Sequence, residues 1–575
     1  MRTTKEIERE VLEILKKRAA SGLRKGEIRR LLNVRGHRQA SAFGQALSNL
    51  QERGAMKQRR GRFRLPEDKN LVTGQISVHP RGFGFVTPGE GGPDIFIPPG
   101  GLNMALSGDY VQVAIHGKDE KGVSGSVHHI LQRGREKLTG EFVRQDDACF
   151  VRPLRRDFPE FIRLNSDRAE EDGGKEAQHG DWIIARLRHP KDPKHALRAV
   201  LSCVLNSGDN LTDDLDAIMA EYELLPRYSA EENERAAKLE PREIERRDLT
   251  DLTVVTIDPA DAKDFDDAIS VEPGSRKDTV RVGVHIAEVA AYVTPESEFD
   301  LTARERAFTA YLPGRTLHML PETLAARRCS LREGQPNYAH SVLMEISRES
   351  GEVLNSERCH SIVNVSKRLT FDDVQACVRG GPPSDWKKRT REAVKTLLDL
   401  YAVMREKRAR TEQFLDLATA EMRVVCQEDP PVITGLKRSA HNESHALVEE
   451  FMLAANVAVA EELERTKLPG VYRVHPEPPE RDLREFRTWS KKALNLRPGR
   501  LSTRGAINDF LKQHEGEKIQ DVLHSAFLKA LPRAGYSAKR QPHFGLGKRC
   551  YTHFTSPIRR YADLLVHQQL WARDL

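Results

Sequence analysis

Apolar residues in the first part of the chain recur at helical spacing. Within residues 4–18 they return every three or four positions, and two further helices are expected over residues 25–32 and 40–53. The basic segment that follows has the pattern of a short hairpin. Three short helices and a basic hairpin predict a winged helix-turn-helix over residues 1–66, with a small protein-docking module as the alternative.

The pattern then changes to the alternation expected of strands. Residues 67–133 alternate apolar and polar side chains between Gly and Pro residues, as in an antiparallel barrel. Residues 134–205 repeat this arrangement, because GDWIIARL there parallels the earlier GDYVQVAI. We therefore expect two OB-type barrels, then a helical connector over residues 206–247 and one large α/β body over residues 248–575.

The first predicted barrel carries aromatic side chains beside arginine and glycine. Phe83 and Phe85 are two residues apart, so both rings leave the same face of one strand, and Phe96 follows on a neighbouring strand. Burial in the core is the ordinary fate of such rings. Their setting in a glycine-rich strand next to Arg81 resembles the cold-shock type of OB fold and favours a stacking platform for unpaired bases.

Composition and charge narrow the classes of protein further. The chain has no run of about 18 apolar residues and no apolar stretch near its start, so neither a membrane span nor a secretory signal is expected. Seven scattered cysteines without zinc spacing favour reduced thiols in a cytoplasmic protein. The net charge is +7, and residues 1–64 hold 18 Lys and Arg against 6 Asp and Glu. This basic module favours nucleic acid as a partner over a merely solvated surface.

The densest group of acidic residues lies between two apolar runs. An apolar strand ends at Asp258, and Asp264, Asp266 and Asp267 follow within nine residues. Carboxylates this close repel one another, so a fold keeps them together only when a cation neutralises them. Oxygen ligands without Cys or His suit Mg²⁺, with Mn²⁺ as the alternative, and do not suit zinc. A solvated acidic loop fits less well with the apolar flanks.

These residues and several later blocks resemble the ribonuclease II/ribonuclease R (RNB) family. The aspartate segment reads IDPADAKDFDDA, and in order come VHIAEV, AYLPG, CSL, HALVEEFMLAANVAVAEEL, VYRVH and YTHFTSPIRRYADL, over roughly residues 248–570. No single block is decisive, but their joint occurrence in this order is specific. The resemblance implies a multidomain α+β protein with a winged helix-turn-helix, two cold-shock-type OB barrels and an α/β RNB catalytic body.

The resemblance implies a processive 3′→5′ exoribonuclease that degrades and processes RNA and releases nucleoside 5′-monophosphates. By position, Asp258, Asp264, Asp266 and Asp267 would hold Mg²⁺ and position the attacking water. Arg559 would stabilise the charge that builds up on the phosphate in the transition state.

Other positions would contact the RNA. Tyr311 would stack on the terminal base, and either Glu449 or Glu450 would read the ribose 2′-hydroxyl, a choice that the residues leave open. Phe371 and Arg560 would also contact the substrate. We expect a monomer that binds single-stranded RNA, while structured RNA with a 3′ overhang stays an open alternative.

The match departs from the family at four points. Glu288 stands where the family usually has Asp, and Phe371 lacks the hydroxyl of a tyrosine linked to preference for RNA over DNA. Leu417, with Phe414 close by, stands where the second aromatic ring of the base clamp is expected. Relatives also continue beyond Leu575 into a further OB domain, whose absence predicts weaker and more salt-sensitive RNA binding.

Two other functions compete with the exoribonuclease. The departures would suit a catalytically impaired RNA-binding scaffold of the same fold, and the basic N-terminal module would suit a DNA-binding regulator. The regulator would leave the aspartate cluster without a purpose. Because all four aspartates and Arg559 are present, the sequence favours the enzyme over both alternatives.

Overall fold

The computed structural model of the chain forms two compact units, Met1–Leu224 and Leu225–Leu575. It describes residues 3–17, 23–34, 36–52, 55–59, 61–64, 71–79, 81–89, 94–119, 122–189, 196–417, 421–428, 431–439 and 442–575. The division into units falls inside the segment predicted as a helical connector. The predicted boundary between residues 66 and 67 lies outside the described residues.

The first unit begins with three helices and a small sheet. The helices are α1 (Thr4–Lys17), α2 (Lys25–Leu31) and α3 (His37–Glu52). The sheet has the order β1-β3-β2 and consists of β1 (Leu23–Arg24), β2 (Lys57–Arg59) and β3 (Arg62–Arg64). The apolar residues at helical spacing in α1, such as Ile7 and Val11, are fully buried in their common core. The three helices and the hairpin expected from the sequence are therefore confirmed.

Two closed five-stranded barrels complete the first unit. The first has the order β4-β5-β6-β8-β7 and the second β10-β11-β13-β12-β9. Their strands are β4 (Leu71–Val78), β5 (Gly84–Pro88), β6 (Ile95–Ile97), β7 (Tyr110–Asp119), β8 (Gly122–Gln132), β9 (Lys137–Gln145), β10 (Ala148–Pro153), β11 (Ile162–Leu164), β12 (Trp182–Arg188) and β13 (Arg198–Asn206). In each barrel the third strand pairs in parallel with the fifth, so the two share one topology. This agreement confirms the predicted repeat.

Short helices accompany the barrels. The 3₁₀ helix η1 (Pro99–Gly101) belongs to the first barrel. Helix α4 (Leu211–Glu221) packs on β9, β12 and β13 of the second. Its Glu221 is buried, accepts a hydrogen bond from the backbone N–H of Thr139 at 2.8 Å and pairs with Arg135 at 2.6 Å. These bonds tie the first half of the predicted connector to the second barrel.

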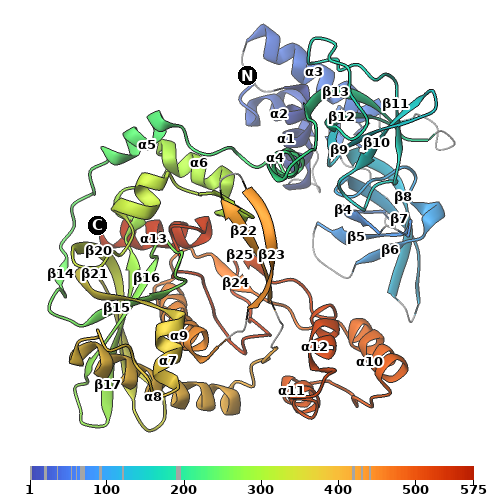
Figure 1. Ribbon diagram of the computed structural model, residues 1–575. Helices are drawn as coiled ribbons and strands as arrows, with labels where there is room; N and C mark the ends of the chain where they lie inside the picture. The colour runs from blue at the N-terminus through green and yellow to red at the C-terminus, as the bar shows by residue number, and fades with distance from the viewer. Residues whose placement is uncertain are drawn as a thin grey trace. The chain divides into compact units, whose positions relative to one another are not determined.

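A six-stranded mixed sheet is the framework of the second unit (Figure 1). Its order is β14-β21-β15-β16-β17-β20, with β14 (Arg247–Asp248), β15 (Val254–Asp258), β16 (Asp267–Pro273), β17 (Thr279–Ala287), β20 (Pro336–Ser347) and β21 (Val353–Thr370). Strand β15 is parallel to β21 and antiparallel to β16. Both of its faces are buried, which explains its continuous apolar run.

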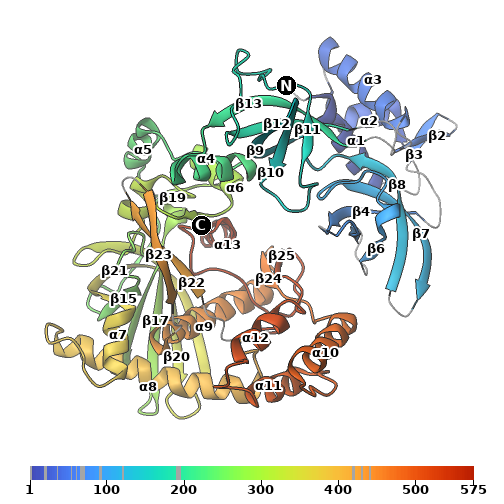
Figure 2. The same cartoon turned by 45° about the vertical axis from the view of Figure 1, so that its right-hand side comes forward.

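Helices cover both faces of this sheet. Helices α7 (Phe371–Val378), α8 (Lys388–Thr411) and α9 (Glu443–Thr466) pack in one core with Val255 and Ile257 of β15 (Figure 2). The other core contains Val254 together with residues of α5 (Ala230–Ala237), η2 (Val289–Ala291), α6 (Glu298–Arg306) and the π-helical turn η3 (Thr323–Arg328). The last helix, α13 (Tyr561–Asp574), contributes to both cores.

Smaller elements surround the sheet. Helices α10 (Glu480–Leu494), α11 (Arg504–Lys512) and α12 (Gln520–Leu528) have a hydrophobic cluster of their own. Three two-stranded sheets are β18 (Ala310–Leu312) with β19 (Arg315–Leu317), β22 (Glu421–Glu428) with β23 (Pro431–Ser439), and β24 (Tyr472–Val474) with β25 (Gly535–Ser537). Among the described residues, the helices are too short or too polar to cross a bilayer.

Candidate active site

Two neighbouring strands bring Asp258 and Asp267 to one edge of the sheet. Asp258 is the last residue of β15, and Asp267 is the first residue of the antiparallel β16. The end of one strand and the start of its antiparallel neighbour lie at the same edge of a sheet, so Asp258 and Asp267 are close together there. Asp264 and Asp266 lie in the loop that connects the two strands. The sheet therefore places all four predicted aspartates in one region.

The segment before α13 fixes Asp266. The backbone N–H of Ile558 donates a hydrogen bond to Asp266 Oδ1 at 2.8 Å, and Arg559 Nε lies 3.5 Å from Oδ2. The Asp266 carbonyl accepts a hydrogen bond from Ala287. Arg559 also donates to Ser556 Oγ at 3.0 Å, and its side chain is 43% exposed. The guanidinium is thus anchored but still open to the cavity.

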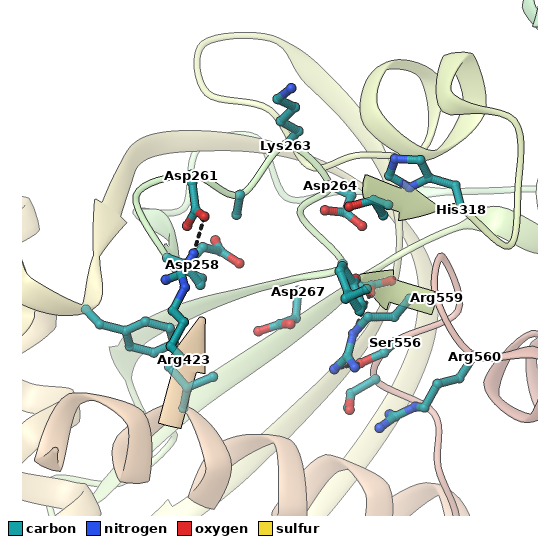
Figure 3. Close-up of a pocket in the computed structure, with 18 of the residues that line it drawn as sticks. Asp258, Asp261, Lys263, Asp264, Asp267, His318, Arg423, Ser556, Arg559 and Arg560 are labelled. Atoms are coloured by element: carbon teal, nitrogen blue, oxygen red, sulfur yellow. Dashed lines mark hydrogen bonds and ion pairs between the residues drawn. The ribbon is translucent and has the colours of Figure 1, made fainter. Parts of the chain in front are cut away.

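The four aspartates and Arg559 line one cavity of about 1430 Å³. Asp258, Asp264 and Asp267 point toward its interior, with Arg559 nearby (Figure 3). Of the predicted RNA contacts, Tyr311, Phe371, Glu449 and Arg560 line the same cavity. The structure thus brings together most of the second-unit residues that the sequence singled out.

Burial raises the free energy needed to ionise these carboxylates. It raises the pKa of Asp258 to about 8, with the nearby Asp267 and Asp266 adding to the shift. Burial raises the pKa of Asp267 to about 6, although Arg559 opposes the change. Burial also raises the pKa of Asp264, and that of Asp266 well above the ordinary range. A positive ion in the cavity would remove this cost.

The donor set fits a hard cation. Asp258 Oδ2 and Asp264 Oδ2 are buried without a hydrogen-bond partner among the described residues, so both oxygens are free to act as ligands. No three of the four carboxylates bring oxygens within 4.8 Å of one another. This spacing agrees with Mg²⁺, which commonly takes one or two carboxylates and completes its shell with water and phosphate oxygens.

A tighter group of metal-type ligands occurs elsewhere in the described part of the chain. His340, His360 and Asp574 place their ligand atoms within 4.8 Å of one another. Arg358 donates hydrogen bonds to both His340 Nε2 and Asp574 Oδ2 at 2.6 Å. Because the guanidinium already holds these atoms, the group is an ion-pair network that fastens α13 to the sheet, and it does not fit a metal.

Tyr311 and Phe371 present rings to the cavity. Tyr311 lies in β18, and its side chain is 59% exposed. Phe371 follows Thr370, which pairs with Asp258 across β21 and β15, so its ring lies beside the aspartates. The ring of Phe371 stacks on His445 with centroids 3.9 Å apart. Among the described residues, no ring stacks on the exposed Tyr311, whereas Phe371 already has a stacking partner in His445.

The two glutamates of α9 separate into different environments. Glu449 is exposed and lines the cavity. Glu450 is buried and pairs with Arg408, whose Nη2 lies 2.9 Å from Glu450 Oε2. Of the two glutamates, only Glu449 therefore presents its carboxylate to the cavity, while the carboxylate of Glu450 faces the interior.

Three other positions that the sequence singled out are engaged in contacts within the protein. Arg560 lines the cavity, but it makes a two-pronged ion pair with the buried Asp563 at 2.7 and 2.9 Å. Leu417 packs against the cluster of α10–α12 and not into the cavity, so the proposed partner for Tyr311 is not found there. Glu288 is buried in an ion pair with Arg246 at 2.9 Å, so this departure from the family does not touch the cavity.

Sequence reasoning missed several residues of the cavity wall. They are Lys263, His318, Arg423, Lys437, Asn456 and Ser556. His318 lies beside Asp264, and its Nδ1 is buried without a partner among the described residues. Asn456 accepts a hydrogen bond from the backbone of Phe554 at 2.8 Å and so positions the segment that holds Arg559. Lys263, Asn456 and Ser556 lie within the family blocks but were not singled out. No local motif marks His318, Arg423 and Lys437, because distant parts of the chain bring them together.

The predicted aromatic face is present on the first barrel. Phe83, Phe85 and Phe96 are partly exposed and lie with ring centroids 5.6–5.9 Å apart. His79, which the sequence did not single out, stacks on Phe83 at 4.5 Å. Arg81 is exposed beside them. The alternative of core phenylalanines is wrong, because Ile76, Val86, Ile95 and Ile97 fill the barrel interior.

Comparison with known proteins identifies the family of this chain. The model of the RNB domain matches residues 246–573, and that of the ribonuclease B OB domain matches residues 74–130. The chain belongs to the RNB family. Ribonuclease R of Aquifex aeolicus (strain VF5) is a relative with 31% identity over 98% of this chain and 79% of its own length.

Solved structures of the RNB family agree with this assignment. The apo form of Mycoplasma genitalium RNase R has a TM-score of 0.72 and 26% identity, covering 87% of this chain and 79% of that chain. Its complex with ribose-methylated single-stranded RNA has a TM-score of 0.71 and 25% identity, with the same coverage of both chains. Its complex with double-stranded RNA has a TM-score of 0.68 and 26% identity, covering 81% of this chain and 80% of that chain. The four aspartates and Arg559 lie within the residues matched by the RNB model, which covers the cavity wall except for Arg227, Tyr228 and Asn233.

Proposed function

We propose that this RNB-family chain, a 3′→5′ exoribonuclease by its relation to ribonuclease R, hydrolyses RNA processively to nucleoside 5′-monophosphates with Mg²⁺ as cofactor. The observation that carries the proposal is the convergence of four buried aspartate carboxylates on a cavity that also contains Arg559 and Tyr311. Two of these carboxylates have a buried oxygen without a hydrogen-bond partner among the described residues. Mn²⁺ would satisfy the same oxygen ligands.

The side chains of the cavity would have different roles in hydrolysis. Asp258, Asp264, Asp266 and Asp267 would hold Mg²⁺ between them, with no more than two of the carboxylates on any one ion as they lie in the structure. The bound metal would activate water and stabilise the leaving 3′-oxygen. Arg559 directs a guanidinium at the phosphate, where its fixed charge offsets the charge of the transition state. Its hydrogen bond to Ser556 and its proximity to Asp266 limit the rearrangement that this requires.

Two other side chains would position the RNA end. The exposed ring of Tyr311 stacks on the terminal base, which contributes about 1–3 kcal/mol per base. The carboxylate of Glu449 reaches the cavity and would accept a hydrogen bond from a ribose 2′-hydroxyl. Phe371 offers no hydroxyl to the sugar, so the discrimination against DNA would rest on Glu449.

The first unit would supply additional RNA binding. Its aromatic face, with Phe83, Phe85 and Phe96, suits stacked unpaired bases. The three helices and basic hairpin at the N-terminus would form a winged helix-turn-helix that contacts backbone phosphates. We place the protein in the cytoplasm as a monomer that acts in RNA degradation and processing, with single-stranded RNA and 3′-overhang duplexes as substrates.

Incubation of 5′-labelled single-stranded RNA with Mg²⁺ tests the activity. The wild type should shorten the RNA stepwise from its 3′ end, and EDTA or Asp266→Asn should abolish the shortening while leaving the RNA bound. Asp251→Asn, an exposed position that does not line the cavity, is the matched control and should retain the ladder. An excess of unlabelled RNA added after binding tests processivity.

Different results would point to different functions. RNA that is shifted in a gel but never shortened by the wild type would favour an RNA-binding scaffold. Shortening that survives both EDTA and Asp266→Asn would refute the metal mechanism. Early release of the label as a mononucleotide would reverse the assigned direction. A DNA oligonucleotide of the same sequence, run beside the RNA, measures the discrimination between the two sugars.

A further inference from the structure

The β22–β23 hairpin presents two cations to the active-site cavity. Arg423 of β22 and Lys437 of β23 are direct cross-strand partners, so their side chains leave the same face of the hairpin. Both line the cavity that contains the four aspartates. The next residue, Arg438, is the partner of Met422 and leaves the opposite face. It pairs with Asp521 of α12 at 2.6 Å and does not line the cavity.

Contacts on the second unit hold the hairpin in this position. The turn between β18 and β19 lies directly against its far end. A Cβ atom added at Gly314 would lie 3.0 Å from Pro431 Cβ and 3.1 Å from Cys426 Sγ. The pair Arg438–Asp521 lies on the opposite face of the hairpin, and both of its side chains are exposed. Packing against the β18–β19 turn therefore keeps Arg423 and Lys437 directed at the cavity (Figure 3 shows Arg423 near Asp258).

Arg423 is paired in a way that an incoming anion can replace. Its guanidinium contacts Asp261, which lies in the loop between Asp258 and Asp264. The two side chains are 60% and 64% exposed. Exposed ion pairs contribute little net stability, so a phosphate can exchange with the Asp261 carboxylate at small cost. Lys437 makes no ion pair with any described residue.

The four aspartates of the cavity make cations in its wall favourable for RNA binding. Besides the two hairpin cations, the wall contains Arg227, Lys263, Arg315, Arg559 and Arg560. RNA has to bring its phosphates next to four carboxylates, whose repulsion opposes binding. On the wall formed before α13, Arg560 is already neutralised by Asp563, which leaves Arg559. In the view of Figure 3, Asp258 and Asp267 lie between Arg559 and Arg423. The hairpin therefore supplies positive charge on a second side of the aspartates.

We propose that Arg423 and Lys437 bind backbone phosphates of the RNA segment next to the scissile bond, and that Arg423 exchanges Asp261 for a phosphate when RNA enters. This inference deepens the proposed function, because it takes RNA to be the ligand of the cavity. In the free protein, the Asp261 carboxylate takes the place of the phosphate and keeps Arg423 directed at the cavity. Neither cation takes part in the chemical step.

Binding of a fluorescein-labelled oligo(U), measured by anisotropy in EDTA on the full chain, tests the proposal without hydrolysis. Arg423→Ala and Lys437→Ala should each weaken binding about tenfold. Each should also lower the slope of log affinity against log salt by about 0.7, the value for one phosphate contact of a single strand. Arg423→Lys should recover part of the loss. In Mg²⁺, KM should rise while kcat at saturating RNA stays unchanged.

Two matched variants separate the proposal from a structural role. Arg438→Ala removes a cation from the same hairpin on the outer face and should leave binding unchanged. Asp261→Asn frees Arg423 and should tighten RNA binding. If Arg423 only braced the aspartate loop, Asp261→Asn and Arg423→Ala would lower kcat equally, and the proposal would be wrong.

Other outcomes would also overturn it. Equal weakening by Arg438→Ala and Arg423→Ala would show only a general effect of net charge. Unchanged affinity and salt slope in the Arg423→Ala, Lys437→Ala double variant would exclude the phosphate contact. Thermal unfolding of each variant checks that the fold is intact. Since binding is measured in EDTA, failure of the hydrolytic mechanism would leave this result interpretable.

Discussion

At the scale of single residues, the consecutive Glu449 and Glu450 of α9 lie in different environments, one in the cavity and the other in a buried ion pair. Glu449 is exposed in the cavity, while the side chains of Glu450 and Arg408 are each only 4% exposed. Arg408 also lies over the ring of Phe414, 3.8 Å from its centroid. Removing one partner of a buried pair leaves an uncompensated charge, so the two glutamates should respond very differently to the same substitution.

We predict that Glu450→Gln lowers the free energy of unfolding by about 3–5 kcal/mol, because Arg408 keeps its charge without a partner. Glu449→Gln should leave stability within about 0.5 kcal/mol and instead raise KM for RNA more than for DNA. Urea unfolding and steady-state kinetics of both variants measure this contrast. Similar stability losses in the two variants would contradict the assignment.

The raised pKa values of the aspartates predict how stability depends on pH without metal. Burial raises the pKa of Asp258 to about 8 and that of Asp267 to about 6, against about 3.9 for Asp in an unfolded chain. Between these values the folded chain binds more protons than the unfolded chain, so the free energy of unfolding falls as pH rises. The stabilising effect of protonation is complete below about pH 4 and is lost through about pH 8.

Thermal unfolding in EDTA between about pH 5 and 9 measures this effect. The Tm of the wild type should fall with rising pH more steeply than that of Asp258→Asn, which has no carboxyl proton to lose at this position. Mg²⁺ should flatten the wild-type profile, because the bound ion replaces the missing protons. Parallel profiles for the two proteins in EDTA would show that Asp258 is not the titrating group.

At the scale of secondary-structure elements, local patterns were sufficient for the framework of the site. The strand that ends at Asp258 and the run that begins at Asp267 are separated by a short loop, so the sequence alone predicted that their carboxylates meet. The barrels and the three N-terminal helices were likewise visible, because the period of their apolar residues changes at each boundary.

Elements joined only by tertiary contacts could not be predicted in the same way. Arg423 and Lys437 face the aspartates because the register of β22 with β23 and the packing against Gly314 orient the hairpin. Neither constraint is readable from a local pattern. Leu417 shows the converse, since alignment with the family placed it opposite Tyr311, whereas its side chain packs, partly buried, against the cluster of α10–α12. That helical cluster was not distinguished within the predicted α/β body.

At the scale of the whole molecule, the proposed sites of chemistry and of additional binding belong to different units. The aspartate cavity lies in Leu225–Leu575, and the partly exposed aromatic face of Phe83, Phe85 and Phe96 lies in Met1–Leu224. If both bind RNA as proposed, a strand long enough to reach both would be held by both, because binding at one site raises the effective concentration at the other. A short oligonucleotide would occupy the cavity alone. The contribution of the first unit should therefore depend on the length of the RNA.

We predict that Phe83→Ala, Phe85→Ala and Phe96→Ala combined raise KM for long single-stranded RNA by at least about tenfold, since each stacked base contributes about 1–3 kcal/mol. Hydrolysis of the shortest oligonucleotides should not change, because these rings take no part in chemistry. Phe150→Ala, in the second barrel, is the matched control for loss of a partly exposed ring. Kinetics over a series of RNA lengths locate where the variant and wild type diverge. Equal kinetics at every length would mean that the aromatic face does not bind the substrate, and equal losses at every length would mean that the substitutions disturb the cavity indirectly.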